Sequence, residues 1–275
     1  MHPRTRPLIF SLLAGLTGCS HQVLQTDIIK GGVPLTRSVV AAVDAETFQA
    51  GSFTGSNGVT LPYRVLLPRH PEQAVRYPLV LQLHGSGGIG TDNVQQLDVL
   101  ARTWAVPQLR DKYRAYVLVP QFPTRSANYG PPAADQHAEP GAALLTALEL
   151  VEKFSSENMV DRSRVYAVGF SMGGSAAWLA ATLKPGLFAA IVPISGIAPD
   201  HHAARLLKDV PVWAMHGNAD AENPIAPDRR LTQAIRMLGG ERIQFREYDG
   251  LDHRLHEDMF PGDWWRDWLF AQHRP

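Results

Sequence analysis

Short apolar runs of strand length recur along the chain from Phe53 onward, and helical patterns separate them. Continuous apolar runs are typical of strands that are covered on both faces. Strands that alternate with helices predict an α/β fold with a mainly parallel, doubly wound sheet. The predicted strands are Tyr63–Leu67, Leu79–Leu83, Ala115–Val119, Val165–Val168, Ala189–Ile194, Val212–Met215 and Ile243–Glu247, and the predicted helices include Val94–Trp104, Ala142–Phe154, Arg229–Leu238 and Asp263–Gln272.

Composition excludes several classes of protein. The 275 residues hold 26 basic and 26 acidic side chains, so no basic surface for a nucleic-acid partner is expected. With 45% apolar residues, the chain can bury a substantial core. A single cysteine excludes an internal disulfide and a cysteine-based zinc site, and no apolar run is long enough for a transmembrane helix.

The N-terminus has the pattern of a targeting segment. Arg4 and Arg6 precede an apolar run at Leu8–Leu16, and Leu-Thr-Gly-Cys ends at the only cysteine, Cys19. That tetrapeptide resembles the bacterial lipobox, which implies a signal peptide over residues 1–18, lipidation of Cys19 and membrane attachment through the lipid anchor. We therefore expect a cell-envelope protein, anchored at the outer membrane or secreted. The alternatives are an ordinary secretory signal or a buried strand with an incidental cysteine.

The remaining chain is expected to have two parts. Residues 19–50 are polar and mixed, and we interpret them as a tether with an N-terminal edge segment. Residues 51–275 are expected to form one α/β domain. The proline-rich loop Gln121–Gly141 has no periodic pattern, and loops of this length are usually functional or mobile.

The strongest chemical motif lies where a predicted strand meets a predicted helix. Val165–Val168 leads through Gly169 to Ser171, and an alanine-rich helical segment follows Gly173. These residues fit G-x-S-x-G, in which a serine sits on a tight strand-to-helix turn with its hydroxyl exposed. Small residues are needed because the backbones approach closely. The alternative is a purely structural glycine-rich connection.

A glycine-rich loop follows the strand Leu79–Leu83, with the pattern H-G-S-G-G that begins at His84. Backbone N–H groups of such a loop can point at a nucleophile and stabilise an oxyanion. We predict the N–H of Ser86 as one donor, with Gly87 next, and the N–H of Met172 as the other. His84 is expected to orient the loop. A phosphate-binding loop is the alternative, but it would end in Lys-Ser/Thr.

A nucleophilic serine needs a base, and the base needs an orienting acid. Asp220 directly follows the strand Val212–Met215, and His253 follows the strand Ile243–Glu247. The chain order Ser, Asp, His is the order of an α/β-hydrolase. We therefore predict Ser171, Asp220 and His253 as the catalytic residues. The alternatives are Glu222, Asp200 and Asp228 for the acid and His256 for the base.

From Phe53 to Phe270 the chain resembles α/β-hydrolase serine esterases of the polyhydroxybutyrate-depolymerase-like and feruloyl-esterase-like group. The motifs that carry the resemblance are Thr91-Asp92-Asn93, Val119-Pro120-Gln121, Gly169–Gly174 and His216-Gly217 with Asp220. The chain departs from the group's pattern at Gly88-Ile89, at Tyr129 and at His256-Glu257, which the resemblance places around the substrate pocket.

The resemblance implies an α/β-hydrolase fold and cleavage of a small-molecule or polymer-borne carboxylic ester through an acyl-enzyme. It implies no cofactor and no metal, and His201 and His202 lack the spacing of a convincing metal site. Two alternatives remain open. One is a serine peptidase of the same fold, and the other is a non-catalytic envelope lipoprotein built on a hydrolase scaffold.

Overall fold

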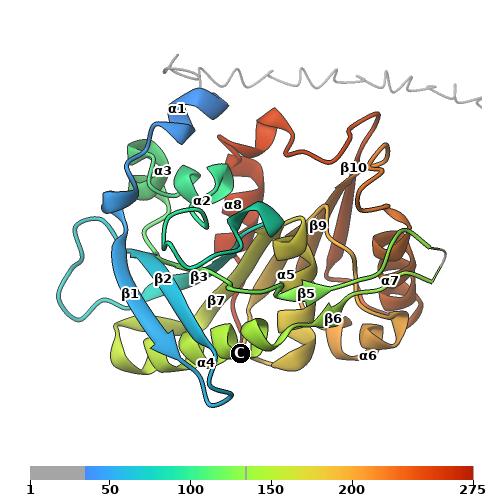
Figure 1. Ribbon diagram of the computed structural model, residues 1–275, viewed down its shortest axis with the longest axis horizontal. Helices are drawn as coiled ribbons and strands as arrows, with labels where there is room; N and C mark the ends of the chain where they lie inside the picture. Colours follow the sequence, from blue (N-terminus) through green and yellow to red (C-terminus); the bar gives the residue numbers. More distant parts are fainter. Residues whose placement is uncertain (1–34, 134, 275) are drawn as a thin grey trace, which may run out of the picture. The chain divides into compact units, whose positions relative to one another are not determined.

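The computed structural model describes residues 35–133 and 135–274, which include a mainly parallel eight-stranded sheet (Figure 1). The strand order is β1-β2-β4-β3-β7-β8-β9-β10, in which only β1–β2 and β2–β4 pair antiparallel. The expected mainly parallel sheet is therefore confirmed. The strands are β1 Gln49–Thr54, β2 Thr60–Leu66, β3 Tyr77–Leu83, β4 Tyr116–Pro120, β7 Val160–Phe170, β8 Ala190–Ile194, β9 Val212–Gly217 and β10 Ile243–Tyr248.

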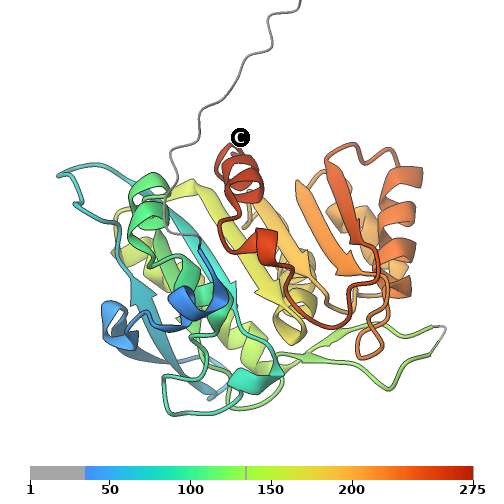
Figure 2. The ribbon, with the colours of Figure 1, turned by 90° about the horizontal axis from the view of Figure 1, so that it is seen from above.

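Helices cover both faces of this sheet (Figures 1 and 2). One core contains Leu81 and Ala167 with side chains of α4 to α7, and the other contains Val80 and Val168 with side chains of α1, α2, α3 and α8. Alternate residues of a strand point to opposite faces, so central strands must be apolar throughout. The helices are α1 Arg37–Ala41, α2 Val99–Thr103, α3 Pro107–Lys112, α4 Ala142–Glu157, α5 Met172–Leu183, α6 Ala204–Leu207, α7 Ala226–Met237 and α8 Asp263–Phe270.

The sequence did not predict strand β1. Its residues, Gln-Ala-Gly-Ser-Phe-Thr, are exposed or half-buried along their whole length, because this edge strand lacks a fully buried face. It pairs antiparallel with β2, with Gln49 opposite Val65 and Thr54 opposite Thr60. Strand pairing, rather than apolar content, therefore determines the structure of this segment.

The helix expected over Val94–Trp104 is shorter in the structure and begins at Val99. Asp92 Oδ1 accepts hydrogen bonds from the N–H groups of Val94 and Gln95, which holds the preceding residues in a turn. Asp98 then caps α2 by accepting the N–H of Ala101 over 2.9 Å. Two aspartates thus satisfy backbone donors locally and separate the turn from the helix.

Residues 35–50 pack onto the domain. Val40 of α1 and Phe48 are fully buried in the same core as Leu100 and Trp104, and Arg64 donates a hydrogen bond to the carbonyl of Phe48. The predicted signal peptide and Cys19 lie outside the described residues. Within the described part of the chain, no helix has the length and apolar character needed to cross a membrane.

The loop Gln121–Gly141 contains a second, small sheet. β5 Ala127–Asn128 pairs antiparallel with β6 Glu139–Pro140. The amide of Gly141 also donates to the carbonyl of Ser126, so the two arms of the loop are tied together at its base. Two-residue strands leave no periodic signal, which is why the sequence pattern did not show them.

Helix α5 packs so tightly on the sheet that Gly173 cannot be enlarged. A Cβ at this position would lie 2.1 Å from the carbonyl oxygen of Leu83. We expect Gly173→Ala to lower the free energy of unfolding by about 2–4 kcal/mol. That corresponds to a fall of about 5–15 °C in Tm, measured by thermal unfolding.

The matched control is Gly130→Ala, because a Cβ at Gly130 meets nothing within 4 Å. Its Tm should stay within about 2 °C of the wild type. An equal Tm for Gly173→Ala and the control would contradict the close packing of α5 on β3.

Candidate active site

Ser171 lies at the turn between β7 and α5 with φ 58° and ψ −122°, a conformation that non-glycine residues rarely adopt. Its N–H donates to the carbonyl of Ile194 over 2.9 Å, which ties the turn to β8. A Cβ at Gly169 would lie 2.3 Å from the carbonyl oxygen of Gly173. The glycines of the G-x-S-x-G pattern are therefore required by close backbone contact.

The structure brings the three predicted catalytic residues together. Nε2 of His253 is 2.8 Å from Oγ of Ser171, and Nδ1 of His253 is 2.6 Å from Oδ2 of Asp220. Ser171 and Asp220 are each 7% exposed. The chain Ser171–His253–Asp220 has the geometry in which an imidazole can remove a hydroxyl proton while a carboxylate fixes its tautomer.

The two predicted oxyanion donors belong to segments that begin next to this serine. Met172 is the first residue of α5, and Ser86 begins a short 3₁₀ helix, Ser86–Gly88. A Cβ at the neighbouring Gly85 would be 3.5 Å from Cβ of Ser171, so the glycine-rich loop passes next to this serine. Neither N–H donates to a backbone carbonyl among the described residues, which leaves both able to serve a ligand.

His84 orients the glycine-rich loop, as the sequence analysis expected. It is fully buried, and its Nε2 accepts the N–H of Phe122 over 3.0 Å. Nδ1 therefore carries the hydrogen and donates to the carbonyl of Gly85 over 2.7 Å. Burial lowers the pKa of His84 to about 4, although the bond to Gly85 opposes the shift, so the ring is neutral at pH 7.

Asp220 is held by several donors at once. Oδ1 accepts the N–H groups of Glu222 and Asn223 over 3.0 and 2.8 Å, and Oδ2 accepts His253. Burial alone would raise the pKa of Asp220, but hydrogen bonds from His216, His253 and Asn223 lower it well below its usual range. The carboxylate is therefore ionised and fixed in orientation.

A second buried histidine, His216, lies next to this acid; it was named above only as part of a motif, with no role. Burial by itself lowers the pKa of His216, but hydrogen bonds to Asp220 and Asp228 and the carbonyl of Asn223 outweigh it and raise the pKa to about 10. Asp228 had been an alternative for the triad acid, and the structure places it against His216 instead of His253. Its position could have been inferred, since Asp228 shares the apolar face of α7 with Leu231.

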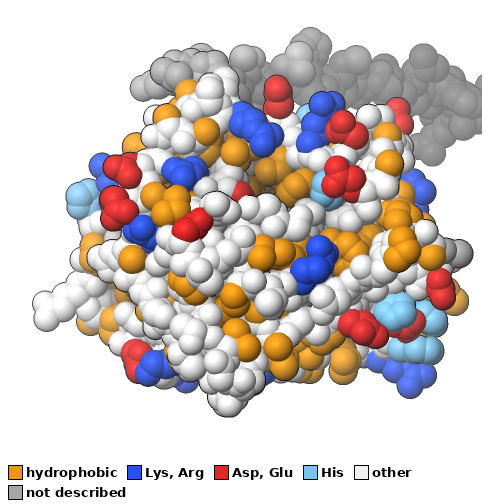
Figure 3. All heavy atoms as spheres, viewed as in Figure 1, with side chains coloured by type: hydrophobic (Ala, Val, Ile, Leu, Met, Phe, Trp, Pro, Cys, Tyr) orange, Lys and Arg blue, Asp and Glu red, His pale blue; other side chains and the backbone are white. Residues whose placement is uncertain are grey.

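A cleft of about 340 Å³ lies beside His253. Asp98 lines it, and burial raises the pKa of this carboxyl to about 6 against hydrogen bonds from the backbone of Ala101, Leu100 and Gly85. Figure 3 shows one face of the molecule, on which apolar side chains reach the surface among basic and acidic ones. The other lining residues include Gly87, Phe170, Leu255, Arg37 and Arg254.

His256 and Glu222 were the other candidates for the base and the acid. His256 stacks on Tyr248 with ring centroids 4.6 Å apart and pairs with Asp258. Glu222 is exposed, and its carboxylate is 3.9 Å from Nε2 of His253, the nitrogen that faces Ser171. Neither residue therefore occupies the position of the triad acid or base.

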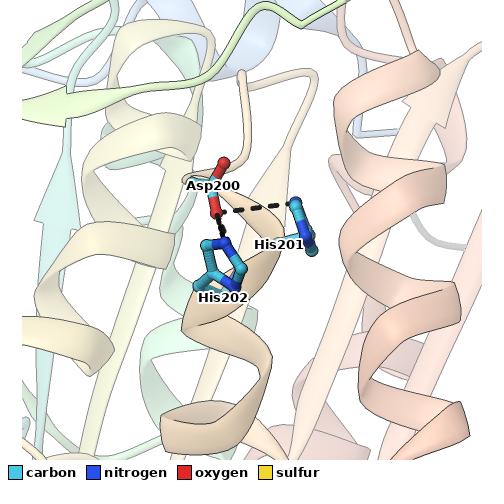
Figure 4. Close-up of side chains that lie close together, drawn as sticks. All are labelled: Asp200, His201 and His202. Carbon is cyan, nitrogen blue, oxygen red and sulfur yellow. Dashed lines mark hydrogen bonds and ion pairs between the residues drawn. The ribbon is translucent and has the colours of Figure 1, made fainter.

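Asp200, the other alternative acid, forms an exposed cluster with His201 and His202 (Figure 4). Its Oδ1 is 3.5 Å from Nδ1 of His201 and 3.8 Å from Nε2 of His202. These are ligand types that zinc accepts, and the local turn places the donor atoms of these consecutive residues within 4.8 Å of one another. All three side chains are exposed, and we assign them no role.

Comparisons with known proteins agree with this fold. Residues 133–261 match the phospholipase/carboxylesterase family model. A protein of Nocardia uniformis subsp. tsuyamanensis assigned as the esterase NocK is 28% identical over 169 residues, 61% of this chain and 47% of the relative. A Salmonella typhimurium protein assigned as a carboxymethylenebutenolidase is 27% identical over 151 residues, 49% of this chain and 56% of the relative.

The crystal structure of a thermostable esterase is 32% identical, with a TM-score of 0.74 over 84% of this chain and 64% of that chain. The chain thus spans about half the length of the curated relatives it matches. The protein has the α/β-hydrolase fold, as expected from the sequence, and its similarity is to hydrolases of the esterase and carboxylesterase type.

Acid titration tests the neutral state of His84. The pKa is about 4 in the folded protein and about 6.5 in an unfolded chain, so the unfolded state binds more protons between these values. The free energy of unfolding should therefore fall by up to about 3 kcal/mol from pH 6.5 to pH 4 because of this residue. Urea denaturation at several pH values measures it.

His84→Gln should lack this part of the pH dependence, since glutamine does not titrate. His273→Gln is the control, because His273 is exposed and the variant should keep the wild-type slope. Identical slopes for the wild type and His84→Gln would show that His84 is not a neutral buried group.

Proposed function

We propose that the protein is a serine hydrolase that cleaves carboxylic esters through an acyl-enzyme. The observation that carries the proposal is the hydrogen-bonded chain Ser171–His253–Asp220, with distances of 2.8 and 2.6 Å, on a strained strand-to-helix turn. The three residues are far apart in the sequence. Their distances in the structure fit a nucleophile, a base and an acid that orients the base.

The geometry supports the following steps. His253 takes the proton of Ser171 as Oγ attacks the ester carbonyl, and the resulting oxyanion accepts the N–H groups of Met172 and Ser86. One such donor contributes on the order of 3 kcal/mol to lowering the barrier. His253 then protonates the leaving alcohol, and a water activated by the same ring releases the acid. Asp220 stays ionised and stabilises the imidazolium.

The resemblance to polyhydroxybutyrate-depolymerase-like and feruloyl-esterase-like enzymes supports an ester as substrate, either a small molecule or part of a polymer. The esterase assignments of the relatives support the same bond type. The cleft beside His253 combines Phe170 and Leu255 with Arg37 and Arg254, which suits an apolar acyl or alcohol group that carries a polar end.

A serine peptidase of the same fold uses the same three residues. Esterase and peptidase are therefore distinguished by the substrates that the protein hydrolyses. We expect hydrolysis of acyl p-nitrophenyl esters and not of aminoacyl p-nitroanilides. Preferred cleavage of the anilides would favour the peptidase.

Ser171→Ala should remove nearly all hydrolysis of a short p-nitrophenyl ester, a loss of at least about 10⁴-fold in kcat, while the far-UV circular dichroism stays unchanged. The reason is that Oγ of Ser171 is the attacking atom. A fluorophosphonate probe should label the wild type and not the variant. If the probe fails to label folded wild-type protein, the result would favour the hypothesis of a non-catalytic protein on a hydrolase scaffold.

His253→Ala and His256→Ala form a matched pair, because both histidines lie in the segment after β10. Only His253 contacts Ser171, whereas His256 contacts Tyr248 and Asp258. We expect a loss of at least about 10³-fold in kcat for His253→Ala and less than about threefold for His256→Ala. A larger loss in His256→Ala would reverse the assignment of the base.

For location, we propose lipid attachment at Cys19 and a place in the cell envelope, on the strength of the lipobox-like Leu-Thr-Gly-Cys sequence. Metabolic labelling with an alkyne fatty acid should mark the full-length protein and not Cys19→Ala. Equal labelling of both, or of neither, would contradict the anchor.

A further inference from the structure

His216 is a buried histidine that the acyl-transfer steps do not use. It is 1% exposed, and Nε2 is 2.8 Å from the carbonyl oxygen of Asn223. A carbonyl oxygen only accepts hydrogen bonds, so Nε2 carries a hydrogen. The same nitrogen is 3.5 Å from Oδ2 of Asp220, so this hydrogen also faces the proposed triad acid.

The other ring nitrogen faces a carboxylate. Nδ1 of His216 is 2.9 Å from Oδ2 of Asp228, which is fully buried, and Oδ1 of Asp228 accepts Nε1–H of Trp178 over 3.1 Å. Burial raises the pKa of the Asp228 carboxyl, whereas the hydrogen bonds with His216 and Trp178 act in the opposite direction and favour the ionised carboxylate. The shared proton then belongs to Nδ1, and both nitrogens of His216 carry hydrogens.

We propose that His216 is an imidazolium held by Asp228, and that it sets the basicity of His253 through Asp220, a positioning role that rests on the proposed function. Oδ2 of Asp220 is 2.6 Å from Nδ1 of His253, so one carboxylate oxygen faces two histidines. A positive charge near that oxygen weakens its attraction for the imidazolium of His253. Loss of that charge would therefore strengthen the pairing of Asp220 with a protonated His253 ring.

The other charged groups near this network have less influence. The pKa of Glu247 in β10 is lowered mainly by Arg229, which lies 2.6 Å from its carboxylate, and the charge of His216 contributes least to this shift. Glu222 lies 3.9 Å from Nε2 of His253, and its side chain is 77% exposed, so solvent screens it. Asp228 is the group that decides whether His216 is charged.

Asp228→Asn isolates that charge. The N–H of Trp178 should keep the amide oxygen on its own side, so that the amide NH₂ faces Nδ1 of His216. Nδ1 must then accept, and His216 becomes neutral while Nε2 still donates to Asn223. We expect the acid limb of the pH profile of kcat/KM for a p-nitrophenyl ester to move up by about one pH unit, an activity loss of about tenfold below the limb.

Trp178→Phe is the matched control. It removes one hydrogen bond that favours the ionised Asp228 but keeps a carboxylate next to His216, so the acid limb should move by less than in Asp228→Asn. A merely structural role for His216 would lower activity in Asp228→Asn equally at every pH. An unmoved acid limb in that variant would overturn the proposal.

A second measurement does not depend on activity or on the folding of a variant. In ¹⁵N NMR of the imidazole rings of the wild-type protein at pH 7, His216 should show two protonated nitrogens and His84 only one. A single protonated nitrogen on His216 would overturn the proposal even if the esterase is active. If two are present and no ester is hydrolysed, the charge on His216 stands and the proposed function fails instead.

Discussion

The close approach of helix α5 to the sheet is the constraint on which the rest of the site depends. A Cβ at Gly169, Gly173 or Gly174 would lie within 2.4 Å of a backbone oxygen of a neighbouring segment. These contacts hold the turn in one conformation. The strained backbone of Ser171 lowers stability, and the close packing around it can offset that cost. The hydroxyl is thereby fixed at the carboxyl ends of the parallel strands, where loops from β3, β9 and β10 can reach it.

Charge burial is the second organising feature. The two buried histidines next to the site are in opposite states: His84 has only backbone partners and is neutral, whereas His216 faces two carboxylates and has a raised pKa. The difference follows from their partners and not from burial, which lowers the pKa of both. The polar groups therefore hold the loops of the site in one geometry without leaving a buried charge unpaired.

The central strands and the three candidate site residues could be predicted from the sequence because each has a local sequence pattern. The apolar runs indicated the central strands, G-x-S-x-G placed Ser171, and the chain order led to Asp220 and His253. The features that the sequence did not predict depend on contacts between distant segments. Strand β1 is defined by pairing with β2, and the partnership of His216 with Asp228 requires β9 and α7 to be packed together. A polar residue on the apolar face of α7 was the only local sign of it.

A chain of polar contacts runs from Ser171 through His253, Asp220, His216 and Asp228 to Trp178; all are hydrogen bonds except the 3.5 Å ion pair between Asp220 and His216. Trp178 belongs to the same helix that Ser171 precedes. The chain is therefore a closed ring, and seven residues of α5 form its last segment. Each residue of an α-helix turns the next by about 100°. One inserted or deleted residue in this stretch would rotate the indole away from Asp228 and open the ring, so the contacts of the ring also fix the length of α5 between Ser171 and Trp178.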